Sequence, residues 1–384
     1  MRRVLIIGNG GEDKYIGNII RECKKIDQSI SFDFFDVEAS GCCMFCKSVG
    51  LYVPTKQHSL MWMYAVPKLR GYLNIRDFKI SLREFVKNCK KQNVLYDVCQ
   101  IHFLNFMYAD VISDLRTIAK KIVLTPWGSD VLKARPFMLK GLRKLVRLSD
   151  VVTVSKGSRF EQDVKRILDV PQSKLYDLAF GVKSIDEILA HPDITTETAK
   201  EALGITGSYA IVVGYNANLG HNHLKVIEQI ATVKDRLPSN YLLVLPLTYG
   251  GNPEYKAKIK NCLETYRLNH LILDKYMSNL DVVNLRMATD LFIHAQNSDA
   301  NAGTIAEYLL CQKKIINPVW ITYPHYETYG SPFYLFSDFE ELPEVIISTI
   351  QDSSLCVSSL LKESIRRCGW GEQSKEWAAL YYNV

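Results

Sequence analysis

The sequence predicts an α/β protein built from two doubly wound parallel-sheet domains. Its 384 residues exceed what a single hydrophobic core usually supports. Short apolar runs, typical of buried strands, alternate with helical patterns of about 10–15 residues. The alternation occurs twice, before and after a polar segment at 186–206, which we interpret as a linker or an irregular helix. Each half is therefore expected to form its own sheet.

The first half, residues 1–190, is expected to be the N-terminal domain. Its predicted strands are "RVLIIG", "SFDFFDV", "DVCQIHF", "KIVLTPW" and "DVVTVS". Helical patterns follow the first strand, with Ile16, Ile19 and Ile20 on one face, and recur at 107–119 and 158–168. Strands separated in this way by helices pair in parallel through right-handed crossovers.

The second half, residues 191–365, repeats the pattern as a C-terminal domain. The predicted strands are "YAIVVG", "YLLVLPL", "HLILDK", "TDLFIHA" and "KKIINP", with helices expected at 222–235 and 253–267. A last helix, "SKEWAALYY", lies in a separate segment, 366–384, that can pack anywhere, including back on the first domain.

Composition indicates an ordinary soluble globular protein, with 47% apolar and 23% charged residues. No stretch approaches the roughly 18 apolar residues of a membrane span, and the apolar run near the start is too short for a signal sequence. We therefore expect a cytoplasmic protein. Most of the ten cysteines stand singly in apolar patterns, and "GCCMFC" lacks the second pair or histidines of a zinc site. Neither a metal nor a cofactor is expected.

Charge is distributed unevenly along the chain. Residues 1–190 contain 31 Lys and Arg against 20 Asp and Glu, whereas 191–384 contain 16 against 21. The basic residues concentrate in 56–91 and 133–147, and such runs attract anionic surfaces such as lipid headgroups, pyrophosphates or nucleic acid. A solvated helix face explains either run alone equally well. Because both runs fall in one half, we favour an anionic partner.

Candidate site residues follow the predicted strands, because ligands of open parallel sheets bind beyond the carboxyl ends of the strands. After the first strand come Gly8, Gly10 and Gly11, which fail the G-x-G-x-x-G fingerprint because Asp13 or Lys14 stands where the third glycine should be. They indicate either a close approach of a ligand or a simple tight turn.

His102 and Asp130 end two other strands of the first half. His102 closes "DVCQIH", a place where a histidine is more often structural than catalytic. Asp130 lies in the turn "WGSD", where its carboxylate can hold a hydroxyl or accept a proton, or can cap the following helix.

In the second half, polar residues and glycines again follow the strands. They are Gly214, Asn216 and Asn218 in "GYNANLGHNH", and Thr248 and Tyr249 in "PLTYGG". The stretch "NSDANAGTIAEYLL" then places Asp299 in a loop and Glu307 one turn inside a helix. Between the two acids, the backbone N–H groups of Ala302, Gly303 and Thr304 open the helix and are suited to a phosphate.

Asp299-x7-Glu307 resembles the E-x7-E element of GT-B glycosyltransferases of the GT4 type. "HFLN", "WGSDV", "SDVVTVSKGSR" and "AFGVKSID" resemble landmarks of the same group. "GYNANLGHNHL", "PLTYG" and "NSDANAGTIAEYLL" are similar to the TDP-N-acetylfucosamine:lipid II N-acetylfucosaminyltransferase family, also called the 4-α-L-fucosyltransferase family. The resemblance spans residues 1 to about 320 and implies two Rossmann-like domains facing a cleft.

The resemblance also implies roles for residues. Glu307 would bind the nucleotide ribose, Asp299 the donor sugar, and Ala302 to Thr304 the diphosphate. Gly10 and Gly11 would face the phosphates or the acceptor. Asp130 is the first choice for a general base in an inverting reaction and His102 the second. The usual Arg…Lys pair of the diphosphate site is missing, so a helix dipole, a histidine, or a cation such as Lys225 or Arg286 would have to replace it.

The expected function is thus metal-independent transfer of a hexose from a UDP-, GDP- or TDP-sugar to a glycan or polyprenyl-linked acceptor in surface polysaccharide synthesis. The basic N-terminal domain would bind the acceptor at the inner face of the membrane, as a peripheral protein. The alternatives are a sugar-nucleotide epimerase of the same fold and a non-enzymatic polyanion-binding module. Because the second half is acidic, we do not expect nucleic acid as a partner.

Overall fold

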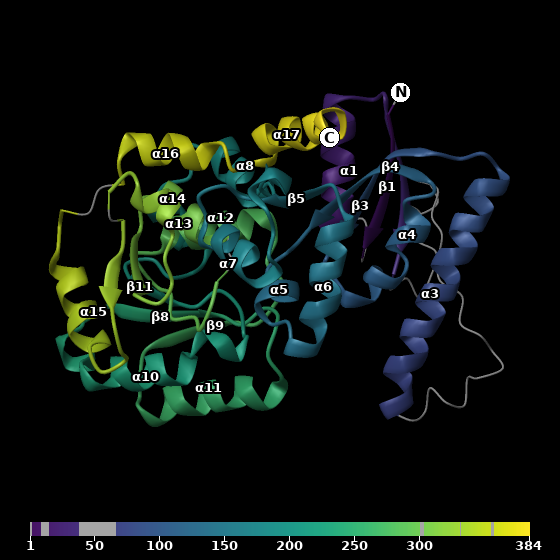
Figure 1. Ribbon diagram of the computed structural model, residues 1–384. Coiled ribbons are helices and arrows are strands. Elements are labelled where there is room, and N and C mark those ends of the chain that lie inside the picture. The colour runs from purple at the N-terminus through teal and green to yellow at the C-terminus, as the bar shows by residue number, and fades with distance from the viewer. Residues whose placement is uncertain (1, 9–14, 38–66, 300–302, 331, 355–356) are drawn as a thin grey trace. The chain divides into compact units, whose positions relative to one another are not determined.

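The computed structural model describes residues 2–8, 15–37, 67–299, 303–330, 332–354 and 357–384. It divides into two compact units. The first comprises Met1–Phe180 with Gly371–Val384, and the second comprises Gly181–Trp370. Among the described residues, each unit contains one six-stranded parallel sheet flanked by helices, and the two parallel sheets are as the sequence predicted (Figure 1). In the described residues, no helix is long and apolar enough to cross a membrane.

The first sheet has the strand order β2-β1-β3-β4-β5-β6. Its strands are β1 (Arg2–Gly8), β2 (Ile30–Asp36), β3 (Tyr96–His102), β4 (Ala119–Thr125), β5 (Val151–Val154) and β6 (Leu175–Asp177). The chain adds β2 on one side of β1 and then crosses to β3 on the other side. The switch point of this sheet therefore lies between β1 and β3, where ligands of doubly wound sheets bind.

The helices that the structure describes in the first unit connect these strands. They are α1 (Tyr15–Ile26), α3 (Pro67–Lys91), α4 (Ile112–Leu115), α5 (Ser129–Leu132), α6 (Pro136–Leu148) and α7 (Arg159–Leu168), with the 3-10 segments η2 (Phe106–Asp110) and η3 (Gln172–Lys174). The expected helix at 107–119 is instead η2, α4 and the start of β4. The Asn105 side chain accepts a hydrogen bond from the Met107 amide and caps η2, which fixes this early start.

Helix α17 (Trp370–Asn383) carries the end of the chain into the first unit. Trp377 is buried and its indole N–H donates to the carbonyl of Ala179 at 2.8 Å. The Tyr381 hydroxyl donates to the Gln100 side chain on β3 at 2.7 Å. Because the Trp377 and Tyr381 side chains are themselves buried, the C-terminal helix is an integral part of the core of this unit.

The second sheet has the strand order β12-β11-β10-β7-β8-β9. Its strands are β7 (Tyr209–Val213), β8 (Tyr241–Pro246), β9 (His270–Leu273), β10 (Leu291–Ile293), β11 (Lys314–Pro318) and β12 (Tyr334–Phe336). The chain runs from β7 outward to β9 and then returns to β10 on the other side of β7. The second switch point therefore lies between β7 and β10.

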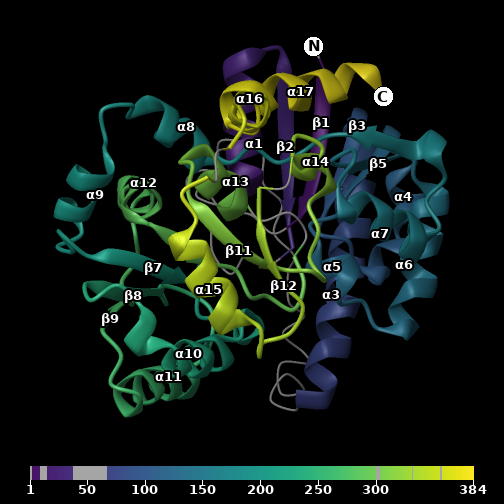
Figure 2. The same cartoon turned by 90° about the vertical axis from the view of Figure 1, so that its left-hand side faces the viewer.

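Successive side chains on these strands point to opposite faces of the sheet and fill two separate apolar layers. Figure 2 shows the helices that cover the two faces. Ile211 and Val213 pack with α10 (His223–Thr232), α11 (Pro253–Thr265) and α15 (Leu342–Gln351). Ala210 and Val212 face the opposite layer. That layer includes α8 (Lys183–Ala190), α9 (Thr196–Ala202), α12 (Asn279–Ala288), α13 (Gly303–Leu310), α14 (Pro324–Glu327) and α16 (Ser359–Arg366). The short 3-10 segments of this unit are η4 (Leu219–His221) and η5 (Lys234–Arg236).

Candidate functional site

The candidate site of the second unit lies at the switch point between β7 and β10. The loop after β7 and the loop after β10 leave the same edge of the sheet here. The Asn222 side-chain amide donates to the carbonyl of Ala295 at 2.7 Å and to Asn297 Oδ1 at 2.9 Å. The Asn297 amide in turn donates to the carbonyl of Gly220 at 2.9 Å. The two loops are thereby held as one surface.

Gly214 is the first residue after β7, and its conformation requires glycine. Its φ of +65° lies in the left-handed region, which favours glycine. A Cβ at this position would stand 2.8 Å from His223 Nε2 and 3.3 Å from the His221 ring. A side chain at Gly214 would therefore meet two histidines of the chain itself, and the role of Gly214 in donor binding stays a prediction.

Three buried histidines lie at this edge: His221, His223 and His294. The ring centre of Tyr215 is 4.3 Å from that of His221 and 6.4 Å from that of His294, and the His223 ring centre is 5.5 Å from that of His221. Burial lowers the pKa of His221 to about 2 and that of His223 to about 4, and it also lowers the pKa of His294. These imidazoles are therefore neutral near pH 7 and can act only as neutral hydrogen-bonding groups.

Hydrogen bonds determine the tautomer of the His221 ring. The Gln296 side-chain amide nitrogen donates to the Tyr215 hydroxyl and lies 3.1 Å from His221 Nε2. In this arrangement His221 Nε2 accepts, so the single proton of the neutral ring is on Nδ1. Nδ1 is buried and has no hydrogen-bond partner among the described residues. The imidazole thus keeps one unused N–H donor at the switch point.

The predicted asparagines build the loop after β7. Asn216 Oδ1 accepts from the Asn218 amide at 2.8 Å, and Asn218 Oδ1 accepts from the Gly220 amide at 2.9 Å. The Ala217 amide donates to the carbonyl of Tyr249, which connects this loop to the one after β8. Tyr249 itself is 61% exposed, and Thr248 beside it is half-buried. The structure therefore brings these four residues to one edge, with the asparagine oxygens used inside the loop.

Glu307 is buried within α13, and both its carboxylate oxygens are engaged. One accepts from Arg286 Nε at 2.6 Å, and the other accepts from the Ser184 hydroxyl. Arg286 also donates to the Tyr308 hydroxyl at 3.0 Å. Arg286, one of the two cations that the sequence offers for the diphosphate, is buried against Glu307. Sequence reasoning missed Ser184 and the ion pair, because these residues lie far apart along the chain.

Asp299 lies in the loop after β10 and accepts a hydrogen bond from the hydroxyl of buried Tyr323. Burial, together with the nearby Asp299 carboxylate, holds the pKa of Tyr323 well above its usual range. Gly303 and Thr304 begin α13, and a Cβ at Gly303 would stand 2.9 Å from Val182. Ala302 lies outside the described residues. The roles of Asp299, Glu307 and the start of α13 in donor binding stay predictions.

The remaining cation considered from the sequence, Lys225, lies on the exposed side of α10. Its ammonium group is 5.0 Å from the centre of the Phe339 ring. In the described part of the chain, no group of three or more His, Cys, Asp or Glu residues has the geometry to hold a metal ion.

In the first unit, Asp130 organises two loops. Its buried carboxylate accepts from the backbone amides of Leu104 at 2.6 Å, Trp127 at 3.0 Å and Gly128 at 2.8 Å. Burial raises the pKa of Asp130, and these backbone hydrogen bonds oppose the rise. The geometry shows Asp130 fixing the loops after β3 and β4, and its role as a general base stays a prediction.

His102 ends β3 at the switch point of the first sheet and is fully buried. Its Nδ1 accepts from the Trp127 indole N–H at 3.3 Å, and an indole can only donate. Burial lowers the pKa of His102 to about 3, so the ring is neutral and its proton is on Nε2. In this tautomer Nε2 is a donor and cannot accept a proton. A base role for His102, still a prediction, would need the other tautomer. Gly10 and Gly11 lie outside the described residues.

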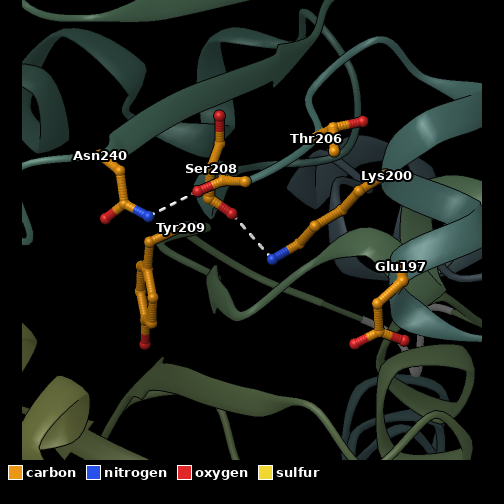
Figure 3. Close-up of a pocket in the computed structure, with 7 residues that line it drawn as sticks. Glu197, Lys200, Thr206, Ser208, Tyr209 and Asn240 are labelled. Carbon is orange, nitrogen blue, oxygen red and sulfur yellow. Dashed lines mark hydrogen bonds between the residues drawn. The ribbon is translucent and has the colours of Figure 1, made fainter.

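A separate hollow of about 300 Å³ lies at the opposite, amino-terminal edge of the second sheet (Figure 3). It is lined by Glu197, Lys200, Thr206, Gly207, Ser208, Tyr209 and Asn240. Two of its polar side chains bind neighbouring backbone: Lys200 Nζ donates to the carbonyl of Ser208 at 2.8 Å, and Asn240 donates to that of Gly207 at 2.6 Å. We therefore do not place the functional site there.

Comparison with solved structures shows the fold of the whole chain. HepE of Anabaena in complex with UDP superposes with a TM-score of 0.68 at 15% identity, covering 100% of both chains. A glycosyltransferase from Rickettsia africae ESF-5 gives 0.66 at 15% identity, covering 99% of this chain and 97% of the other. Sucrose-phosphate synthase from Thermosynechococcus elongatus gives 0.67 at 12%, covering 100% and 98%.

These similarities establish a GT-B fold with two Rossmann-like domains, as predicted. No protein-family model matches the sequence, and no curated protein matches it either. Membership of the TDP-N-acetylfucosamine:lipid II N-acetylfucosaminyltransferase family therefore stays a prediction.

Proposed function

We propose that this protein is a glycosyltransferase that uses a nucleoside diphosphate sugar as donor. The observation that carries the proposal is the pair of loops after β7 and β10, which Asn222 binds together at the switch point of the second sheet. HepE was solved with UDP and also with UDP-glucose, which supports a uridine nucleotide as the first donor to test.

In the proposed reaction, an acceptor hydroxyl oxygen bonds to the anomeric carbon of the donor sugar. The bond from that carbon to the diphosphate breaks, and the nucleoside diphosphate leaves with the electron pair. The hydroxyl proton passes to a base or to the leaving phosphate. The amide groups at the start of α13, an eight-residue helix, and the neutral His221 N–H are suited to the negative charge that develops on the diphosphate. Metal independence is part of the proposal.

The acceptor is proposed to be a glycan or polyprenyl-linked molecule bound by the first unit, in surface polysaccharide synthesis. Helix α6 supports contact with an anionic membrane surface, because Lys140, Lys144 and Arg147 are exposed on it and Phe137 near its start is 65% exposed. Sedimentation with vesicles of anionic lipid tests this contact. Binding at low salt that is lost at high salt supports it, and no binding at low salt refutes it.

The donor is tested by thermal unfolding with a panel of UDP-, GDP- and TDP-sugars. A ligand at about 100 times its dissociation constant stabilises the folded chain by roughly 2.7 kcal/mol, which is readily measured as a rise in Tm. We expect at least one sugar nucleotide to raise Tm. The same sugar without the nucleoside diphosphate should not raise it. No rise with any of the sugar nucleotides would refute the proposed function. Turnover of the donor without acceptor would instead identify an epimerase.

A matched pair of asparagine variants locates the binding. Asn222→Gly removes the amide that joins the two loops, while glycine tolerates the φ of +55° at this position. Asn240→Ala removes a similar side-chain bond to a carbonyl at the opposite edge of the same sheet. We expect Asn222→Gly to weaken donor binding and Asn240→Ala to leave it unchanged. Equal effects of the two variants would contradict this location.

A further inference from the structure

His294 is the first residue beyond β10, directly at the switch point of the second sheet. In the sheet, its neighbour Ile293 pairs with Val213 of β7, and the His294 amide donates to the carbonyl of Ile316 on β11 at 2.9 Å. The ring is fully buried. Its backbone is therefore fixed on both sides by the sheet, and the side chain projects from a rigid element.

The tautomer of His294 is determined by Asn317. The side-chain nitrogen of Asn317 donates to the carbonyls of Pro318 at 3.0 Å and Ile321 at 2.7 Å. These two bonds orient the amide, so that its oxygen faces His294 Nδ1 at 2.9 Å. An amide oxygen can only accept, and therefore Nδ1 carries the proton. In a neutral imidazole Nε2 is then a bare lone pair.

His294 Nε2 has no hydrogen-bond partner among the described residues, although it is buried. A buried polar atom without a partner is costly, by about 1–3 kcal/mol, and such atoms call for an explanation. A lone pair repels phosphate oxygens, which are also acceptors, so its complement is an O–H or N–H group. The tautomer thus selects for a hydroxyl or amide part of a ligand.

A second acceptor lies close to His294. The Asp299 carboxylate partly opposes the lowering of the His294 pKa by burial. Tyr323 lies beside both residues: its ring centre is 6.4 Å from that of His294, and its hydroxyl donates a hydrogen bond to Asp299. The titratable groups facing His294 include Asp299, Tyr323 and His221. Two neighbouring hydrogen-bond acceptors match a ligand that carries several hydroxyl donors. In a sugar nucleotide, the transferred sugar is the part with the most hydroxyl groups.

We propose that His294 Nε2 accepts a hydrogen bond from a hydroxyl of the transferred sugar, in a tautomer that Asn317 holds. The inference rests on the proposed function and deepens it, because it names the part of the donor that this side chain recognises. His294 is then a specificity-determining residue, and Asn317 is a positioning residue that acts through it.

Two variants of His294 and one control variant distinguish the roles of the two ring nitrogens. His294→Asn keeps an N–H for Asn317 near the position of Nδ1 and deletes the acceptor at Nε2. His294→Gln places an amide oxygen near the position of Nε2 and serves as the rescue. His270→Asn is the control, since His270 begins β9 at the opposite edge of the same sheet and its Nδ1 already contacts the carbonyl of Leu268 at 2.8 Å.

Affinities for UDP and for UDP-glucose are measured for the wild type and each variant by titration calorimetry. UDP has ribose hydroxyls and a base N–H but no transferred sugar. Its affinity therefore shows whether His294 binds a hydrogen-bond donor of the nucleotide instead of one of the sugar. We expect His294→Asn to weaken UDP-glucose about tenfold, the effect of one lost hydrogen bond, and to leave UDP unchanged. His294→Gln should recover most of the loss, and His270→Asn should bind like the wild type.

Other results would overturn the inference. Equal losses for UDP and UDP-glucose would assign the contact to the nucleotide, and unchanged affinities would remove His294 from the site. If the wild type binds no sugar nucleotide at all, the proposed function fails first. A ligand-independent test is the ¹⁵N spectrum of labelled histidine, with His294→Asn identifying the signal. A protonated Nδ1 is expected for His294, and a protonated Nε2 would refute the tautomer.

Discussion

Lowering the pH from 7.5 to 5.5 should destabilise the second unit through its buried histidines. Burial lowers the folded-state pKa of His221 to about 2 and that of His223 to about 4. In the unfolded chain both titrate near their usual value of about 6.5. Below that pH the unfolded state takes up protons that the folded state does not, so the free energy of unfolding falls as the pH falls.

The magnitude follows from the linkage relation. At pH 5.5, one unit below the unfolded pKa, each histidine that stays neutral in the folded state lowers the free energy of unfolding by about 1.4 kcal/mol. His221 and His223 together therefore remove about 3 kcal/mol. His294, whose pKa is also lowered by burial, acts in the same direction. Most of this stability is present above about pH 6.5 and is lost progressively below it.

Urea unfolding at the two pH values measures the effect. With a urea dependence of roughly 3 kcal/mol per molar, the upper range for small proteins, the midpoint for the second unit should fall by about 1 M or more. His223→Gln removes one titrating group, so the difference between its midpoints at the two pH values should be clearly smaller. Midpoints that do not change with pH would refute the neutral, buried state of these histidines.

Two further substitutions test contacts that lie at the predicted site residues. Glu307→Gln leaves the Arg286 guanidinium buried without its counter-charge, so we expect a loss of about 3–5 kcal/mol in the free energy of unfolding, measured by urea denaturation. The double variant with Arg286→Met should recover part of that loss, and a Glu307→Gln protein as stable as the wild type would contradict the ion pair. Asp130→Asn retains only one acceptor oxygen for three backbone amides, and a loss of about 2 kcal/mol is expected in thermal unfolding. An unchanged Tm for Asp130→Asn would show that these bonds do not hold the loops.

Strand and helix periodicity was sufficient to predict the two parallel sheets, because their strands are buried on both faces and read as apolar runs. The sequence did not reveal β6 or β12. Each has only three residues, and "LYD" and "YLF" are too short to show a periodic pattern. A helix at 107–119 was expected from its apolar spacing, but Asn105 starts a 3-10 turn there and Ala119 already belongs to β4.

At the candidate site, the sequence indicated which loops to inspect but not how their side chains pair. Glu307 was selected from its spacing to Asp299, whereas its partners Arg286 and Ser184 belong to other helices. His294 was overlooked, although it directly follows β10 and therefore stands at a strand end, as His102 does at the end of β3. Its chemistry depends on Asn317, which stands on the neighbouring strand. Pairings of this kind arise from the strand order and cannot be read from local sequence.

The central claim, that the joined loops after β7 and β10 bind a nucleoside diphosphate sugar, is tested most directly by backbone hydrogen exchange with and without UDP-glucose. Binding at the switch point predicts slower exchange for amides in residues 214–223, 294–299 and 303–307. Amides around the hollow at the opposite edge, near Ser208 and Asn240, should be unaffected. Protection confined to other parts of the chain, or no protection under saturating ligand, would contradict the account.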